Sequence, residues 1–319
     1  MRTVIHVGLH KCASTYLQER VFPKLDARYL RLGNHADARE FFLDEIRFGA
    51  PFDAPAFARR VERRAGADAS ADKPLVLSHE ALSGDPHGQD AWDPIRIANR
   101  LRDAFRGASV FLVVRNQFDY ALSMYAWRVC QAGLVSEGLS PFLRKMLKGG
   151  LDRKLQYDSL VASYGEIFGA DRLLVLPVEL LRHDQARFLE TVRRFVGVEF
   201  RDTGVFEPAR GENESTRSKR IISLLRAMNR PARAACAGLR LAGLRGPADK
   251  VEHRYVDFKR FRLLPWLRRA VRRSPLLQAP AWLHEEYGAA FAASNARLEK
   301  LTGLSLAQYG YALPDAARK

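Results

Sequence analysis

A short run near the start of the chain, residues 8–15, combines residue types that suit an anion. It reads Gly-Leu-His-Lys-Cys-Ala-Ser-Thr and stands between an apolar run and a segment with helical spacing. A loop in that place turns backbone N–H groups and a helix N-terminus toward one point. Ser14 and Thr15 would cap the helix and offer hydroxyls to phosphate oxygens, while Lys11 would add a positive charge. Taken alone, the run is as typical of an ordinary capped turn with a solvated lysine.

The position of Lys11 separates this loop from the Mg-nucleotide loop of kinases, which needs Gly before its Lys and Ser or Thr directly after it. Here Lys11 stands three residues before Ser14. A second cation, Arg115, directly follows another apolar run, and Ser123 comes eight residues later. An arginine fork and a hydroxyl suit a second phosphate, although Arg115 could instead pair with Asp119.

Together these two elements resemble the sulfotransferase superfamily that uses 3′-phosphoadenosine 5′-phosphosulfate (PAPS), in particular its bacterial and Golgi-type carbohydrate branch. In that family the first loop reads roughly His-Lys-Thr-Gly-Thr-Thr and is followed by Leu-Gln. This chain has His-Lys-Cys-Ala-Ser-Thr at residues 10–15, and then Leu17 and Gln18. It departs from the family at Cys12 and Ala13, so Ala13 must adopt a backbone shape that favours glycine.

The resemblance implies a donor site made of three pieces. The first loop would bind the 5′-phosphosulfate, with candidates Lys11, Cys12, Ala13, Ser14 and Thr15. Arg115 and Ser123 match the spacing of the family's 3′-phosphate pair. A late loop, residues 207–215, would close over the nucleotide with Arg210, Gly211 and Ser215, although a polar surface loop is an equally good interpretation of that stretch.

Sulfuryl transfer to a hydroxyl needs a base for the acceptor proton, and two candidates follow the second apolar run. They are His79 and Glu80 in the sequence Ser78-His79-Glu80. Adjacent side chains on an extended segment point in opposite directions, so one of the two should face the donor. Resemblance to bacterial relatives with Ser-x-Glu favours Glu80, and His79 remains the alternative. Lys11 would also stabilise charge on the departing phosphate, and no metal is expected.

Four continuous apolar runs predict strands at residues 4–7, 75–78, 109–114 and 173–176, and segments of helical spacing alternate with them. Such alternation predicts an α/β, P-loop-like three-layer fold with a central parallel sheet flanked by helices. The carboxyl ends of the strands, where ligands bind in such sheets, carry the candidate residues. We expect a core over residues 1–216 and a basic, mostly helical C-terminal region over 217–319 packing on it.

The net charge of +16 is concentrated in this C-terminal region. Residues 217–273 hold 17 Lys and Arg against three acids, for a local charge of +14. Several helix breakers interrupt the region, among them Pro231, Gly238 and Gly243. Residues 263–273 mix apolar and basic side chains, which suits an anionic inner membrane or an acidic polysaccharide; a solvated helical face would look similar.

The sequence therefore predicts a metal-independent sulfotransferase that moves a sulfuryl group from PAPS to a hydroxyl of a glycan, lipid-linked sugar or glycolipid and leaves PAP. Two alternatives are a Mg-dependent nucleotide phosphotransferase and a polyanion-binding protein acting through the basic region. Three scattered cysteines, no 18-residue apolar run and no convincing signal peptide predict a cytoplasmic protein, peripheral at most on the inner face of a membrane. No nucleic acid is expected as a partner.

Overall fold

The computed structural model describes residues 2–32, 42, 44–48, 51–66, 72–84, 93–201, 206, 217–271 and 274–314. The chain divides into two compact units, each built from segments distant in sequence. The first consists of Met1–Gln117, Lys148–Ala209 and Glu286–Lys319, and the second of Phe118–Leu147 and Arg210–Glu285. The boundary expected after residue 216 stays a prediction about domains.

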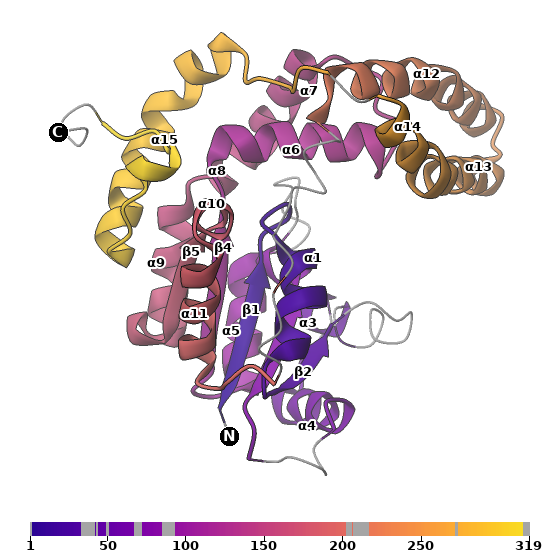
Figure 1. Ribbon diagram of the computed structural model, residues 1–319. Helices are drawn as coiled ribbons and strands as arrows, with labels where there is room; N and C mark the ends of the chain where they lie inside the picture. The colour runs from indigo at the N-terminus through magenta and orange to yellow at the C-terminus, as the bar shows by residue number, and fades with distance from the viewer. Residues whose placement is uncertain are drawn as a thin grey trace. The chain divides into compact units, whose positions relative to one another are not determined.

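The first unit is built around a five-stranded parallel sheet in the order β2-β3-β1-β4-β5 (Figure 1). Its strands are β1 (Thr3–Gly8), β2 (Arg28–Arg31), β3 (Leu75–His79), β4 (Ser109–Val114) and β5 (Leu173–Pro177). The four strands predicted from apolar runs are confirmed. In the register, Val7 lies opposite His79 on one side, and Gly8 lies opposite Val113 on the other. The first loop therefore begins level with the carboxyl ends of both neighbouring strands.

Helices flank this sheet, as the predicted α/β class requires (Figure 1). Ring contacts join His6 of β1 to Phe22, and Phe111 of β4 to Phe188. Helix α9 contacts β4 and β5 and packs on α5. The helical elements assigned wholly or mostly to this unit are α1 (Ser14–Tyr16), η1 (Leu17–Val21), η2 (Phe22–Lys24), α3 (Asp44–Phe48), α4 (Ala54–Arg64), η4 (Glu80–Ser83), α5 (Pro94–Ala104), α8 (Asp152–Lys154), α9 (Tyr157–Phe168), η6 (Ala170–Arg172), α10 (Val178–His183), α11 (Gln185–Val196), α15 (Ala281–Thr302) and η9 (Ala307–Tyr309).

The second unit is helical in its described part. Its elements are α6 (Gln117–Cys130), α7 (Leu139–Met146), α12 (Lys219–Leu241), α13 (Arg245–Phe258), η8 (Lys259–Leu263) and α14 (Leu264–Ala270); η5 (Leu147–Leu151) starts in this unit and continues into the first. Helices α12 and α13 pack together as a hairpin. Lys259 is fully buried and donates hydrogen bonds to the carbonyls of Val129 and Gly133 and to Asn229 Oδ1, over 2.8, 2.6 and 3.0 Å. This ammonium group binds the C-terminal end of α6 to two other helical segments.

The expectation that Pro231 and Gly238 would interrupt the basic region is wrong, because α12 runs through both. Pro231 is exposed, and so is Ala227, whose carbonyl loses its helical donor to the proline ring. Because Ala227 is exposed, that carbonyl can accept a hydrogen bond from water instead. The helix hairpin turns at Gly243, whose φ of +79° is the left-handed shape that ends a helix.

Candidate active site

The loop that follows β1 is the most strained part of the described backbone. Among the described residues, two that are not glycine have positive φ, Lys11 at 65° and Ala13 at 60°. Such a conformation costs an L-residue about 1–2 kcal/mol. The expectation that Ala13 must take a glycine-like shape is therefore confirmed. Strain of this kind persists where the surrounding structure enforces it, commonly at binding sites.

The strained loop leads into α1, whose first turn receives no side-chain cap from the N-cap residue. Ala13 is the N-cap residue, but its side chain has no oxygen with which to accept a hydrogen bond from the first turn. Ser14 instead donates its hydroxyl to the carbonyl of Leu9 over 3.3 Å. The first turn of a helix carries unpaired N–H groups and a partial positive charge, so this end of the loop suits an anion.

Arg115 fixes the loop from the neighbouring strand. Its Nη1 donates to the carbonyl of Lys11 over 2.9 Å, and the Tyr157 hydroxyl donates to the carbonyl of Arg115 over 2.8 Å. The side chain is 3% exposed, and its Nε has no hydrogen-bond partner among the described residues. A buried guanidinium N–H without an acceptor costs free energy, which an anionic ligand could recover.

The second member of the predicted phosphate pair, Ser123, lies in α6 and belongs to the second unit. It is 3% exposed. In the same unit, Asp119 forms an ion pair with Arg217 at 2.8 Å. The joint role of Arg115 and Ser123 stays a prediction. Arg210, Gly211 and Ser215 lie outside the described residues.

Glu80 begins the turn that follows β3 and is connected to a chain of buried polar groups. Gln18 Nε2 donates to Glu80 Oε2 over 3.3 Å and lies 3.0 Å from Ser78 Oγ. Ser78 Oγ in turn lies 2.8 Å from His6 Nδ1. Burial lowers the pKa of His6 to about 3, so His6 is neutral in this chain. Sequence reasoning assigned no role to Gln18, Ser78 or His6.

The carboxyl group of Glu80 is ionised at neutral pH. Burial by itself raises its pKa, but His79, the backbone N–H of Glu80, His10 and Gln18 together outweigh burial and hold the pKa below its ordinary value of 4.5. A partly buried carboxylate held by charge and hydrogen bonds is able to accept a proton.

His79 has a structural task in the same turn. Its Nδ1 accepts a hydrogen bond from the backbone N–H of Ala81 over 2.9 Å and thereby caps η4. A neutral imidazole with an accepting Nδ1 carries its proton on Nε2. His79 can therefore take up a further proton only by giving up this cap.

Cys12 is fully buried in the loop, and burial raises the pKa of its thiol to about 12. It is therefore a neutral thiol, which excludes it as a nucleophile at neutral pH. Its backbone N–H donates to the carbonyl of Leu9 over 3.2 Å, so Cys12 serves the turn of the loop. Among the described residues, no three His, Cys, Asp or Glu side chains come together as a metal site would require.

The segment directly after β4 is held rigidly. The backbone N–H of Asn116 donates to Glu179 over 3.1 Å, and the Tyr311 hydroxyl donates to the same carboxylate over 3.0 Å. Gln117 and Asn295 exchange side-chain hydrogen bonds of 2.6 and 3.3 Å. These contacts fix the backbone next to Arg115. The residues that make them from other parts of the chain lie about 60–200 positions from Arg115 in the sequence.

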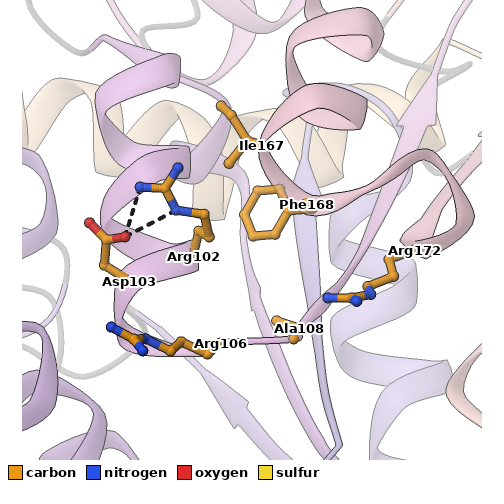
Figure 2. A pocket seen from close by; sticks show the side chains of 8 residues that line it. Arg102, Asp103, Arg106, Ala108, Ile167, Phe168 and Arg172 are labelled. Carbon is orange, nitrogen blue, oxygen red and sulfur yellow. Dashed lines mark hydrogen bonds and ion pairs between the residues drawn. The ribbon is translucent and has the colours of Figure 1, made fainter.

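A separate cavity of about 340 Å³ lies at the opposite edge of the sheet (Figure 2). Residues 106–108 precede β4 and Arg172 precedes β5, so the cavity is at the amino ends of these strands. In Figure 2 the guanidinium of Arg102 donates hydrogen bonds to the carboxylate of Asp103, and Phe168 lies nearby. The cavity therefore lies apart from the loop and from Glu80.

Comparison with solved structures identifies the fold. The sulfotransferase from Alicyclobacillus acidocaldarius is similar with a TM-score of 0.55 and 15% identity, covering 97% of this chain and 98% of that chain. The mouse sulfotransferase SULT7A1 complexed with PAP is similar with a TM-score of 0.37 and 16% identity, covering 63% and 61%. No family model matches the chain, and no curated protein matches it in sequence. The first similarity shows that the chain has the fold of that sulfotransferase.

Proposed function

We propose that this chain is a sulfotransferase that uses PAPS as donor and releases PAP. One observation carries the proposal: the two left-handed non-glycine residues of the described chain, Lys11 and Ala13, both lie in the loop between β1 and α1. This loop stands at the carboxyl edge of the sheet, where β1 is flanked by the ends of β3 and β4. Ligands of open parallel sheets bind at that edge. The fold shared with a bacterial sulfotransferase supports this assignment.

The first loop would hold the phosphosulfate end of the donor. Lys11 contributes charge, Ser14 and Thr15 contribute hydroxyls, and the backbone around Cys12 and Ala13 contributes N–H groups. Support comes from the uncapped first turn of α1. Arg115 and Ser123 would hold the 3′-phosphate, which is consistent with the buried Nε of Arg115, for which the described residues offer no hydrogen-bond partner.

The donor, when bound, supplies a sulfuryl group whose direct in-line transfer leaves negative charge on the departing phosphate. Lys11 would stabilise that charge more strongly in the transition state than in the ground state, which is what accelerates a reaction. The proposed scheme requires no metal ion.

Glu80 would accept the proton of the acceptor hydroxyl. It is a carboxylate at neutral pH, and Gln18 orients one of its oxygens. His79 is the weaker candidate, because its Nδ1 is engaged by the N–H of Ala81.

For the acceptor we propose a hydroxyl of a glycan, lipid-linked sugar or glycolipid, supported by the resemblance of residues 10–18, together with Arg115 and Ser123, to the carbohydrate branch of the superfamily. For the location we propose the cytoplasm, with peripheral contact to the inner face of a membrane. Cys12, Cys130 and Cys236 are all free and buried, as is typical of a reducing compartment. No helix in the described part of the chain is both long and apolar enough to cross a membrane.

Two matched variants test the assignment of the base. Glu80→Gln keeps the shape of the side chain but cannot accept a proton, so transfer of label from PAPS to a panel of glycans and glycolipids should fall about 10²–10⁴-fold. His79→Asn keeps an oxygen that can cap η4 and should retain most of the activity. The opposite result, an active Glu80→Gln and an inactive but folded His79→Asn, would assign the base to His79. Transfer that no variant affects would refute the site.

A further inference from the structure

The helical stretch from the end of α13 to α14, residues 258–270, exposes large aromatic side chains. Phe258 is 49% exposed, Phe261 62% and Trp266 61%. Other residues of the same stretch pack into the interior of the second unit, since Lys259, Leu264 and Leu267 are buried. The aromatic rings are thus on the solvent side of a segment whose inner side is already packed.

The same stretch is strongly basic on its solvent side. Between residues 258 and 270 there are five Lys and Arg and no Asp or Glu. Of these, Arg260, Arg262 and Arg269 are exposed, and the guanidinium of Arg260 lies 5.0 Å from the Phe261 ring centre. No ion pair within the described residues involves any of the three. Arg240 at the end of α12 differs, because Asp249 and Glu252 both pair with it.

Lys259 fixes which side of this stretch faces inward. Its three ammonium hydrogens are directed to Val129, Gly133 and Asn229. Because η8 is tied down at Lys259, the neighbouring residues 258, 260 and 261 face solvent. The exposure of the aromatic rings therefore follows from packing within the second unit, because Lys259 anchors the stretch that carries them.

We propose that residues 258–270 dock the second unit on an anionic lipid surface, with Phe258, Phe261 and Trp266 entering the headgroup region and Arg260, Arg262 and Arg269 binding lipid phosphates. Large aromatic rings flanked by arginines are the composition of interfacial helices, and aromatic side chains favour the boundary between headgroups and acyl chains. The negative surface of an inner leaflet attracts unpaired basic residues. This inference goes beyond the sulfuryl transfer and does not depend on it.

The test is co-sedimentation of the full chain with vesicles of phosphatidylcholine, with and without phosphatidylglycerol. The wild type should bind the anionic vesicles and bind the neutral ones weakly. The triple variant Phe258→Ser, Phe261→Ser, Trp266→Ser should lose about tenfold or more in vesicle affinity. The triple variant Arg260→Gln, Arg262→Gln, Arg269→Gln should lose its preference for anionic vesicles.

A matched control removes three exposed arginines from α4 in the first unit, Arg59→Gln, Arg63→Gln and Arg64→Gln. It should bind vesicles like the wild type. PAP binding, measured on the same preparations, reports separately on the donor site and on folding. The proposal is overturned if the α4 variant loses as much as the aromatic variant, if the aromatic variant binds like the wild type, or if the wild type binds a soluble acidic polysaccharide but no vesicle.

Discussion

Gly8 ends β1 at the point where the first loop begins, and a methyl group added there tests how closely the site is packed. The Cβ of an alanine would lie 2.7 Å from Ser14 Oγ, 3.2 Å from Glu80 Cα and 3.2 Å from His6 Cε1. Ordinary contacts of such an atom begin at 3.4 Å. The hydroxyl of Ser14 can rotate, but it then loses its bond to Leu9. The backbone of Glu80 has no such freedom.

We expect Gly8→Ala to lower the free energy of unfolding by about 1–3 kcal/mol, the usual cost of overpacking in a close-packed site. Because relief of the contact moves Ser14 or Glu80, PAP affinity should fall about tenfold, equivalent to about 1.4 kcal/mol. The assays are denaturant unfolding and calorimetric titration with PAP. Gly149→Ala is the matched control, since Gly149 is exposed and has no atom within 4 Å of its Cβ position. If both variants behave alike, the loop is not packed against Glu80 and the proposed site is wrong.

Three further predictions concern single groups. Ala13→Gly should stabilise the chain by about 0.5–1 kcal/mol in thermal unfolding, because glycine relieves the left-handed strain at a smaller entropic cost, and a loss of stability would contradict the strain. Activity should fall as the pH drops through the pKa of Glu80. The variant Gln18→Leu removes a hydrogen bond that lowers the pKa of Glu80, so it should move the acid limb of the kcat/KM profile to higher pH. If the acid limb does not move, Gln18 is not a positioning residue for Glu80. Burial lowers the pKa of Lys259 from 10.5 to about 8, so between these values the unfolded chain binds the proton that the folded chain has lost. The wild type should therefore gain stability relative to Lys259→Met as pH rises through that window, and a constant difference would refute the shift.

The sheet was predictable from the sequence because four of its strands are continuous apolar runs, which is what burial on both faces requires. Strand β2 escaped prediction, since it reads Arg-Tyr-Leu-Arg and, among the described strands, pairs with β3 alone. Its extended shape comes from the neighbouring strand and not from its own side chains. The prediction of a break at Pro231 failed because tertiary packing stabilises α12, and a proline on the solvent side of the helix is tolerated.

The candidate site was predictable where it is local and unpredictable where it is assembled from distant segments. Lys11 and Ala13 lie in the loop after β1, and Glu80 directly follows β3, so their place at the carboxyl edge of the sheet follows from the positions of these strands. His6 and Ser78, in contrast, lie opposite each other because of the register between β1 and β3, which no spacing in one sequence reveals. The cap formed by His79 depends on its rotamer, which the sequence does not reveal, and this cap is why we propose Glu80 in preference to His79 as the base.

Calorimetric titration of the wild-type chain with PAP tests the central proposal most directly. We predict saturable binding that Arg115→Ala weakens strongly, whereas Arg172→Ala, at the arginine-lined cavity on the opposite edge of the sheet, leaves it unchanged. Absence of binding by the folded wild type, or binding that depends on Arg172 and not on Arg115, would contradict the account.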